Sequence, residues 1–326
     1  MMGSRQVARC SRCGTIVDPQ ILSRSKCPKC SVDLRSCIQC VNFDPGASFE
    51  CSAEYQKVIG ESDLSPSYQW RDILRQVHPD DAGRVAQAID AAGHPALLLV
   101  DTISSLGSMD YRHDEWGVDV TIAGSQKGLM LPPGLSFNCV SEKARNASRS
   151  ATLPRSYWSW EEMIAQNRTG YFPYTPATNL LYGLRESLRM LQEEGLDNVF
   201  ARHDRHAEAT RRAVRAWGLE ILCAVPEEYS SSLTAVLMPA GHDADALRKV
   251  ILDAYDMSLG LGLGKMAGKI FRIGHLGDFN DLMLTGTLSG VEMGLALAGV
   301  PHARGGVQAA LDYLVQCARE PQRKAA

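Results

Sequence analysis

Residues 101–144 read DTISSLGSMDYRHDEWGVDVTIAGSQKGLMLPPGLSFNCVSEKA, and this stretch decides the fold. It begins at the end of ALLLVD (96–101), an apolar run typical of a buried parallel strand. Residues 118–124 and 134–141 are further strand candidates separated by short turns, and a helix is expected just before the first strand. The pattern therefore predicts an α/β fold with a mostly parallel sheet.

Two charged residues lie at the ends of these predicted strands. Asp101 ends the first strand, and Lys127 lies in the turn GSQKGL (124–129) after the second. Because the carboxyl ends of parallel strands meet at one edge of a sheet, both side chains can face one pocket. A lysine and a carboxylate there suit pyridoxal 5'-phosphate (PLP), whose aldehyde forms a Schiff base with the amine while its pyridine nitrogen pairs with the acid. From spacing alone, an ordinary ion pair or two unrelated surface charges remain the simpler interpretation.

The surrounding sequence resembles the cofactor segment of the class V aminotransferases of the serine:glyoxylate and alanine:glyoxylate type. The resemblance runs from about Ala91 to the carboxyl terminus and continues through PRSYWSWEEM, TGYFPYTPATNLLYGLRESL and FRIGHLGDFNDLM. It implies a partial PLP-transferase fold of type I with a smaller α+β carboxyl-terminal domain. The activity implied is transamination between a small amino acid, serine or alanine, and a 2-oxo acid, glyoxylate.

The resemblance also implies roles for residues around the cofactor. Lys127 carries the Schiff base and is the catalytic residue, and Asp101 pairs with the pyridine nitrogen. Ile103 packs on the ring face, and Gln126 hydrogen-bonds the phenolic oxygen.

Three further residues are implied to complete the site. Tyr174 and Thr175, in FPYTPATN, are expected to reach across a homodimer interface to the PLP phosphate of the neighbouring subunit. Arg272, in FRIGH, is expected to bind the substrate carboxylate, because a guanidinium offers a planar fork that matches a carboxylate. Without the resemblance, the first two would be turn residues and Arg272 a salt-bridge arginine on a strand.

The segment before Asp101 departs from the family pattern. A phosphate-binding loop, an aromatic residue stacked on the ring and a hydrogen-bonding Thr or Ser are expected there, but the sequence has a cysteine cluster, and Gly46, Gly60, Gly83 and Gly93 are isolated. Since phosphate is normally the main anchor of PLP, we expect weak PLP binding and slow transamination. The alternative is a non-catalytic fusion of a zinc-binding interaction module with an aminotransferase remnant.

Seven of the ten cysteines lie between Cys10 and Cys51. The pairs Cys10/Cys13 and Cys27/Cys30 have the spacing at which four thiolates surround one zinc ion, which would hold a segment too poor in apolar residues to build a core. The remaining Cys37, Cys40 and Cys51 are one ligand short of a second site. Cys139, Cys223 and Cys317 lie in apolar segments and are interpreted as small core residues.

These patterns divide the 326 residues into a zinc-ribbon-like module (1–55), a linker (56–85), a partial PLP-binding large domain (86–199) and a small domain (200–326). A net charge of −3 argues against general binding to nucleic acid, and basic residues in the ribbon do not by themselves indicate it. No apolar run is long enough for a membrane span and no secretory signal is visible, so a cytoplasmic location is predicted.

Two smaller features complete the sequence-based expectations. The run SLGLGLGK (258–265) does not fit a nucleotide-binding loop and is interpreted as a flexible loop near the substrate pocket. His203 and His206 lie in a charged helical stretch and are expected to be solvated.

Overall fold

The computed structural model describes residues 8–9, 16–17, 79–155 and 157–319. The chain divides into two compact units, of which one comprises Met1–Arg75 with Leu263–Met266 and the other Gln76–Gly262 with Ala267–Ala326. In the first unit, the described strands β1 (Ala8–Arg9) and β2 (Ile16–Val17) pair antiparallel, and η4 (Gly264–Met266) is a 3-10 turn. All seven cysteines of the predicted metal module lie outside the described residues.

The second unit begins with a three-stranded sheet in the order β3 (Leu99–Asp101), β4 (Val120–Gly124), β5 (Ser136–Val140). Strands β3 and β4 are parallel, with Asp101 opposite Ile122, whereas β5 runs antiparallel to β4. The expectation of a mostly parallel sheet is therefore not met by β5. The physical reason is the connection between Gly124 and Ser136, which contains no crossover helix of the kind that a parallel pairing needs.

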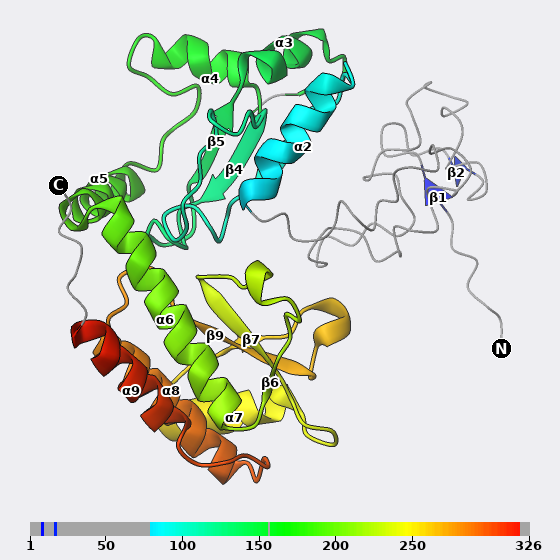
Figure 1. The fold of residues 1–326 in the computed structure, drawn as a ribbon. Helices are drawn as coiled ribbons and strands as arrows, with labels where there is room; N and C mark the ends of the chain where they lie inside the picture. Colours follow the sequence, from blue (N-terminus) through cyan, green and yellow to red (C-terminus); the bar gives the residue numbers. More distant parts are fainter. Residues whose placement is uncertain (1–7, 10–15, 18–78, 156, 320–326) are drawn as a thin grey trace. The chain divides into compact units, whose positions relative to one another are not determined.

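Helices α2 (Pro79–Ala91), α3 (Glu142–Ser150) and α4 (Trp160–Asn167) accompany this sheet (Figure 1). Helix α2 begins inside the range expected to be a linker, and its Ala82 and Ala86 are buried. The buried carboxylate of Asp119 joins neighbouring elements, because it accepts hydrogen bonds from the Leu98 backbone N–H (2.9 Å) and from the Ser141 hydroxyl (2.9 Å), which caps α3.

A second sheet is entirely antiparallel and has the order β6 (Glu220–Ile221), β7 (Leu233–Leu237), β9 (Ile270–Gly274), β8 (Gly260–Leu261). A 3-10 turn, η3 (Pro226–Glu228), precedes β7. The stretch expected to be a flexible loop thus contains β8, whose Gly260 pairs with Arg272. Sequence reasoning missed this strand because glycine has little strand propensity and the pairing is made by a distant segment.

Long helices pack with this second sheet and with one another (Figure 1). They are α5 (Thr178–Glu194), α6 (Leu196–Ala216), α7 (Ala244–Tyr255), α8 (Asp281–Leu297) and α9 (Gly306–Arg319). The core contains fully buried Trp217, Phe271 and Leu288. Glu292 of α8 accepts hydrogen bonds from the Trp217 indole (2.8 Å) and from the Val307 N–H (3.0 Å), and so anchors the start of α9.

Burial corrects two of the sequence-based expectations. His203 and His206 are both completely buried rather than solvated, because one face of α6 packs into the molecule. Cys139 is exposed on β5 rather than being a core residue, and Cys223 and Cys317 are half-buried.

Candidate active site

Lys127 lies in a tight turn that follows β4. Its carbonyl accepts a hydrogen bond from the Met130 N–H (2.9 Å), and the Ser125 carbonyl accepts one from the Leu131 N–H (3.0 Å). Met130 has a φ of +60°, a conformation that non-glycine residues rarely adopt. The buried Ser125 hydroxyl also donates to the Pro132 carbonyl (2.8 Å), so the turn is fixed by several hydrogen bonds around the lysine.

Asp101 and Lys127 leave the sheet at the same edge. Strands β3 and β4 are parallel with Asp101 opposite Ile122, and Lys127 follows the carboxyl end of β4. Asp101 is exposed, and its Oδ1 accepts the Ile103 N–H (2.9 Å). The sequence-based expectation that these residues share one sheet edge is therefore confirmed.

Gly124 brings two further predicted residues together. A Cβ atom added to Gly124 would lie 2.8 Å from Oε1 of Gln126 and 3.2 Å from Cδ1 of Ile103. Both side chains therefore lie over the bare backbone at the end of β4. The structure thus gathers Ile103 and Gln126 at the strand end from which the Lys127 turn departs.

Gly128 allows the turn of Lys127 to touch the loop that follows Asp101. A Cβ atom at this position would lie 2.2 Å from the Leu106 carbonyl oxygen and 2.8 Å from the carbonyl carbon of Gly107. Since backbone atoms cannot yield as a flexible side chain can, only glycine fits. Sequence analysis did not assign a role to Gly128, although its place directly after the lysine was a signal.

Helix α5 supports the same turn from another side. The buried Ser187 hydroxyl donates to the Leu129 carbonyl at 2.5 Å. Leu129 and Leu131 form a small apolar cluster with Leu191 of α5 and Val199 of α6. The Lys127 turn is therefore attached to the body of the unit by both polar and apolar contacts.

Arg272 lies on β9 between β7 and β8. Its Nε donates to the Leu261 carbonyl (2.8 Å), and its side chain passes over Gly260, where an added Cβ would lie 3.2 Å from Nε. Gly260 therefore makes room for the arginine, and the Leu261 carbonyl orients it. This arrangement leaves both terminal nitrogens without a hydrogen-bond partner among the residues that the structure describes.

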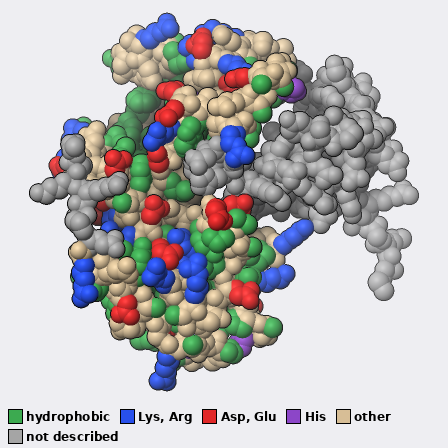
Figure 2. All heavy atoms as spheres, in the orientation of Figure 1, with side chains coloured by type: hydrophobic (Ala, Val, Ile, Leu, Met, Phe, Trp, Pro, Cys, Tyr) green, Lys and Arg blue, Asp and Glu red, His purple; other side chains and the backbone are tan. Residues whose placement is uncertain are grey.

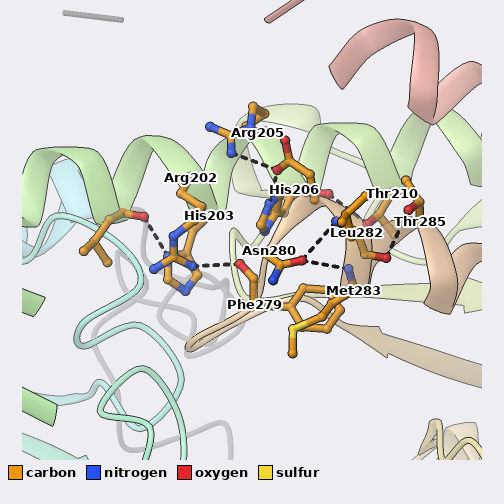
Figure 3. A network of polar contacts seen from close by, with 12 residues as sticks. Arg202, His203, Arg205, His206, Thr210, Phe279, Asn280, Leu282, Met283 and Thr285 are labelled. Carbon is orange, nitrogen blue, oxygen red and sulfur yellow. Dashed lines mark hydrogen bonds and ion pairs between the residues drawn. The ribbon is translucent and has the colours of Figure 1, made fainter. Parts of the chain in front are cut away.

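The strand that carries Arg272 leads to Gly277, which meets the Lys127 turn. Gly277 has a φ of +82°, and a Cβ added to it would lie 3.5 Å from Met130 Cγ and 3.8 Å from the Lys127 carbonyl oxygen. Arg202 and His203 of α6, which are labelled in Figure 3, both form hydrogen bonds with Gly277. The segment that follows the Arg272 strand thus contacts the Lys127 turn at Gly277.

Tyr174 and Thr175 lie in the connection between α4 and α5. The Tyr174 hydroxyl accepts the Tyr157 N–H (2.9 Å) and lies 3.5 Å from a carboxylate oxygen of Glu162. Both Tyr174 and Thr175 are exposed. These contacts belong to a different part of the unit from those that gather Ile103, Gln126 and Lys127.

Three buried histidines, two on α6 and one directly after β9, have lowered pKa values. Burial lowers the pKa of His203 and of His206, and lowers that of His275 to about 3. The hydrogen bonds from Arg202 lower the pKa of Glu194. Elsewhere, Figure 2 shows acidic and basic side chains interspersed over the displayed face of the described residues.

Metal-ligand clusters and membrane-spanning helices are both absent from the part of the chain that the structure describes. Over these residues, no group of three or more His, Cys, Asp or Glu side chains is arranged to hold a metal ion. Among the helices described, none combines the length and apolar character that crossing a membrane requires.

Known proteins share sequence and fold with this chain. The family model described as aminotransferase class-V matches residues 81–263. A serine–glyoxylate aminotransferase of Methylorubrum extorquens is 54% identical over 238 residues, which cover 71% of this chain and 59% of the relative. An L-aspartate–glyoxylate aminotransferase of Paracoccus denitrificans is 47% identical over 76% of this chain and 62% of its own length.

A solved structure of pyridoxamine-pyruvate aminotransferase from Mesorhizobium loti superposes with a TM-score of 0.68 at 32% identity, covering 72% of this chain and 61% of that one. The chain thus spans about three-fifths of the length of these relatives.

Proposed function

Because the chain belongs to the class V aminotransferases, we propose that it catalyses PLP-dependent transamination between a small amino acid, serine or alanine, and glyoxylate. The observation that carries the proposal is the gathering of Ile103 and Gln126 over Gly124, beside the turn of Lys127 and at the sheet edge where Asp101 ends its strand. The names of two relatives, which pair serine or aspartate with glyoxylate, support the choice of acceptor.

These residues fit the pyridine end of PLP. When bound, PLP supplies an aldehyde that bonds to a lysine amine and a ring that withdraws electrons from the substrate. Asp101 would accept the hydrogen bond of the ring nitrogen through the carboxylate oxygen that Ile103 leaves unused. Gln126 would contact the phenolic oxygen, and Ile103 would cover one ring face.

Lys127 would serve both as the attachment point and as the acid–base group. When it is not bonded to the cofactor, the Lys127 Nζ would accept the proton from the substrate Cα and would donate it to the carbon of PLP that carries the aldehyde. The turn around Lys127 is held by backbone hydrogen bonds and by Ser187, so only the side chain has to move during this exchange.

Arg272 would bind the α-carboxylate of the amino acid. Its Nε is already oriented by the Leu261 carbonyl, so its two terminal nitrogens present a fork to the substrate. The bare backbone of Gly260 keeps this orientation accessible to the side chain.

The site would be completed in a homodimer. Tyr174 and Thr175 are proposed to reach the PLP phosphate of the neighbouring subunit. Large apolar side chains near them are exposed in the single chain, among them Leu153, Trp158, Tyr171 and Tyr182. Such exposure supports a protein–protein contact in this region.

We further propose weak cofactor binding and slow turnover, because the sequence before Asp101 has no counterpart of the family's phosphate loop. The alternative is a non-catalytic fusion protein. In either case the amino-terminal cysteines Cys10, Cys13, Cys27 and Cys30 are proposed to hold one zinc ion, and elemental analysis of the purified protein with and without a chelator tests that part.

The decisive test of the enzyme is a PLP titration of the purified full chain, followed by borohydride trapping and mass spectrometry. A visible absorbance band and a label on Lys127 are expected, and both should disappear in Lys127→Ala. Lys143→Ala is the matched control, because Lys143 is ion-paired with Asp90 and Asp119 at 3.4 Å and has no proposed role.

Assays with serine or alanine and glyoxylate then separate the two functions. Slow turnover is expected from the enzyme and none from a non-catalytic fusion. Absence of the band in the wild-type chain would contradict PLP binding, and turnover as fast as in a full-length family member would contradict the proposed impairment.

A further inference from the structure

Helix α6 presents a buried histidine to the turn at Gly277. The His203 Nδ1 lies 2.7 Å from the Val199 carbonyl oxygen, and Nε2 lies 3.0 Å from the Gly277 N–H. A carbonyl oxygen can only accept and a backbone N–H can only donate, so the ring carries its proton on Nδ1 and leaves Nε2 bare. His203 is therefore held neutral, in one tautomer, by its two partners.

Arg202 holds the other side of the same glycine. Its Nη1 donates to the Gly277 carbonyl (2.7 Å) and to the Phe279 carbonyl (3.2 Å). The other two guanidinium nitrogens of Arg202, Nε and Nη2, donate to the two carboxylate oxygens of Glu194, the last residue of α5, at 2.7 and 2.8 Å. The N–H and the C=O of Gly277 are thus both fixed by consecutive residues of one helix.

Gly277 transmits this constraint to both halves of the proposed site. It packs against Met130 and the Lys127 carbonyl on one side, at the distances given above. On the other side, His275 joins it to β9 and is itself fixed by hydrogen bonds to Thr234 (3.0 Å) and Ser231 (3.1 Å). Only His275 and Leu276 lie between Gly277 and the end of β9, the strand that carries Arg272.

We propose that Arg202 and His203 are positioning residues, which set the distance between the Lys127 amine and the Arg272 guanidinium by holding Gly277 between them. Neither residue is required to touch the substrate or the cofactor. The catalytic meaning rests on the proposed function, whereas the mechanical coupling between α6 and the Lys127 turn does not.

His206 provides a matched control within the same helix. It is equally buried, but its Nε2 contacts Asp281 at the start of α8 (2.8 Å) instead of Gly277. A general loss of core packing would affect His203→Leu and His206→Leu alike. If His203 acts specifically through Gly277, only His203→Leu should affect the Lys127 turn.

The test is hydrogen exchange of the full chain without added PLP, read on peptides that contain residues 124–131 and 281–288. In His203→Leu, exchange of 124–131 is expected to accelerate about tenfold, which corresponds to the loss of one buried hydrogen bond. His206→Leu should instead accelerate 281–288 and change 124–131 less than about threefold. His203→Gln, which restores an acceptor, should recover part of the protection.

If His203→Leu does not fold, Glu194→Gln gives the same test, because it weakens the anchor of Arg202 at a half-buried position. With PLP present, the positioning variants should retain the cofactor band but raise KM for the amino acid more than they lower kcat. Equal acceleration of 124–131 in the His203 and His206 variants would overturn the inference. If His203→Leu leaves the exchange of 124–131 unchanged but the wild-type chain shows a normal PLP band, the inference fails and the proposed function stands. If the exchange changes as expected but the wild-type chain shows no PLP band, only the proposed function is refuted.

Discussion

The two sheets of the second unit differ in how completely their apolar residues are covered. In the antiparallel sheet, Val236, Phe271 and Ile273 are fully buried together with α8 side chains such as Leu284. In the sheet that carries Asp101, Leu99 is 56% exposed on the edge strand β3 and Ile122 is 36% exposed on β4. The region around Arg272 therefore has a core of its own, whereas the sheet beside Lys127 leaves apolar side chains exposed on its edge strand and on β4.

The largest expected difference between the sheets is in unfolding free energy. Phe271→Ala should reduce it by about 3–5 kcal/mol, because the side chain is fully buried and its removal leaves a cavity. Ile122→Ala should cost less, about 1–2 kcal/mol, because Ile122 is 36% exposed and its truncation removes less buried apolar surface than the loss of the Phe271 ring. Urea unfolding followed by circular dichroism measures both, and equal losses would contradict the comparison.

A second prediction concerns the contact between the two site loops. Gly128→Ala should destabilise the chain by about 1–3 kcal/mol and weaken PLP binding, because the new Cβ would meet the backbone at Leu106. Gly286→Ala is the control, since that glycine is exposed within α8 and a Cβ there has open space. The control should stabilise the chain by about 0.5–1 kcal/mol.

The buried histidines should make the unfolding free energy of the chain depend on pH in mildly acidic solution. The folded pKa values of His203, His206 and His275 lie below the ordinary value because burial disfavours the charged ring. The unfolded chain therefore binds more protons below about pH 6.5, so stability present above that pH falls as pH decreases toward the folded pKa, which is about 3 for His275.

Each of these histidines should contribute a slope of at most about 1.4 kcal/mol per pH unit in that window. Urea unfolding between pH 7.5 and 5 measures the total slope. His94→Gln, at an exposed position, should leave it unchanged, whereas His275→Gln should reduce it. An unchanged slope in His275→Gln would contradict the assigned burial effect.

Sequence periodicity predicted the regular elements well where one segment alone determines them. The helix expected before the first strand corresponds to α2, and the expected strands at 118–124 and 134–141 contain β4 and β5. Strand β8 was missed because Gly260 and Leu261 become a strand only through pairing with β9. Helix α9 was also absent from the sequence-based expectations, because its start is fixed by hydrogen bonds to Glu292, which lies on another helix.

The sequence suggested which residues belong to the candidate site, but not which buried residues hold them in place. Asp101 and Lys127 were assigned because the sequence around them resembles the cofactor segment of the family, and Arg272 was assigned from its motif. The burial of His203 could not be predicted, since its neighbours in the sequence are charged and its partner, Gly277, lies far along the chain. The expected roles of Tyr174 and Thr175 depend on a second subunit and remain predictions.

The smallest expected effect on stability comes from the open edge itself. Leu99→Lys should change the unfolding free energy by less than about 0.5 kcal/mol, because an exposed side chain loses little burial when it is replaced. The same substitution should weaken self-association, since a lysine on an edge strand opposes pairing with another chain. Sedimentation velocity at several concentrations measures the association, with Leu252→Lys, at an exposed position on α7, as the control. If both variants associate as the wild-type chain does, the edge at β3 is not part of the proposed homodimer contact, and the exposed aromatic residues around Tyr171 are the surface to test next.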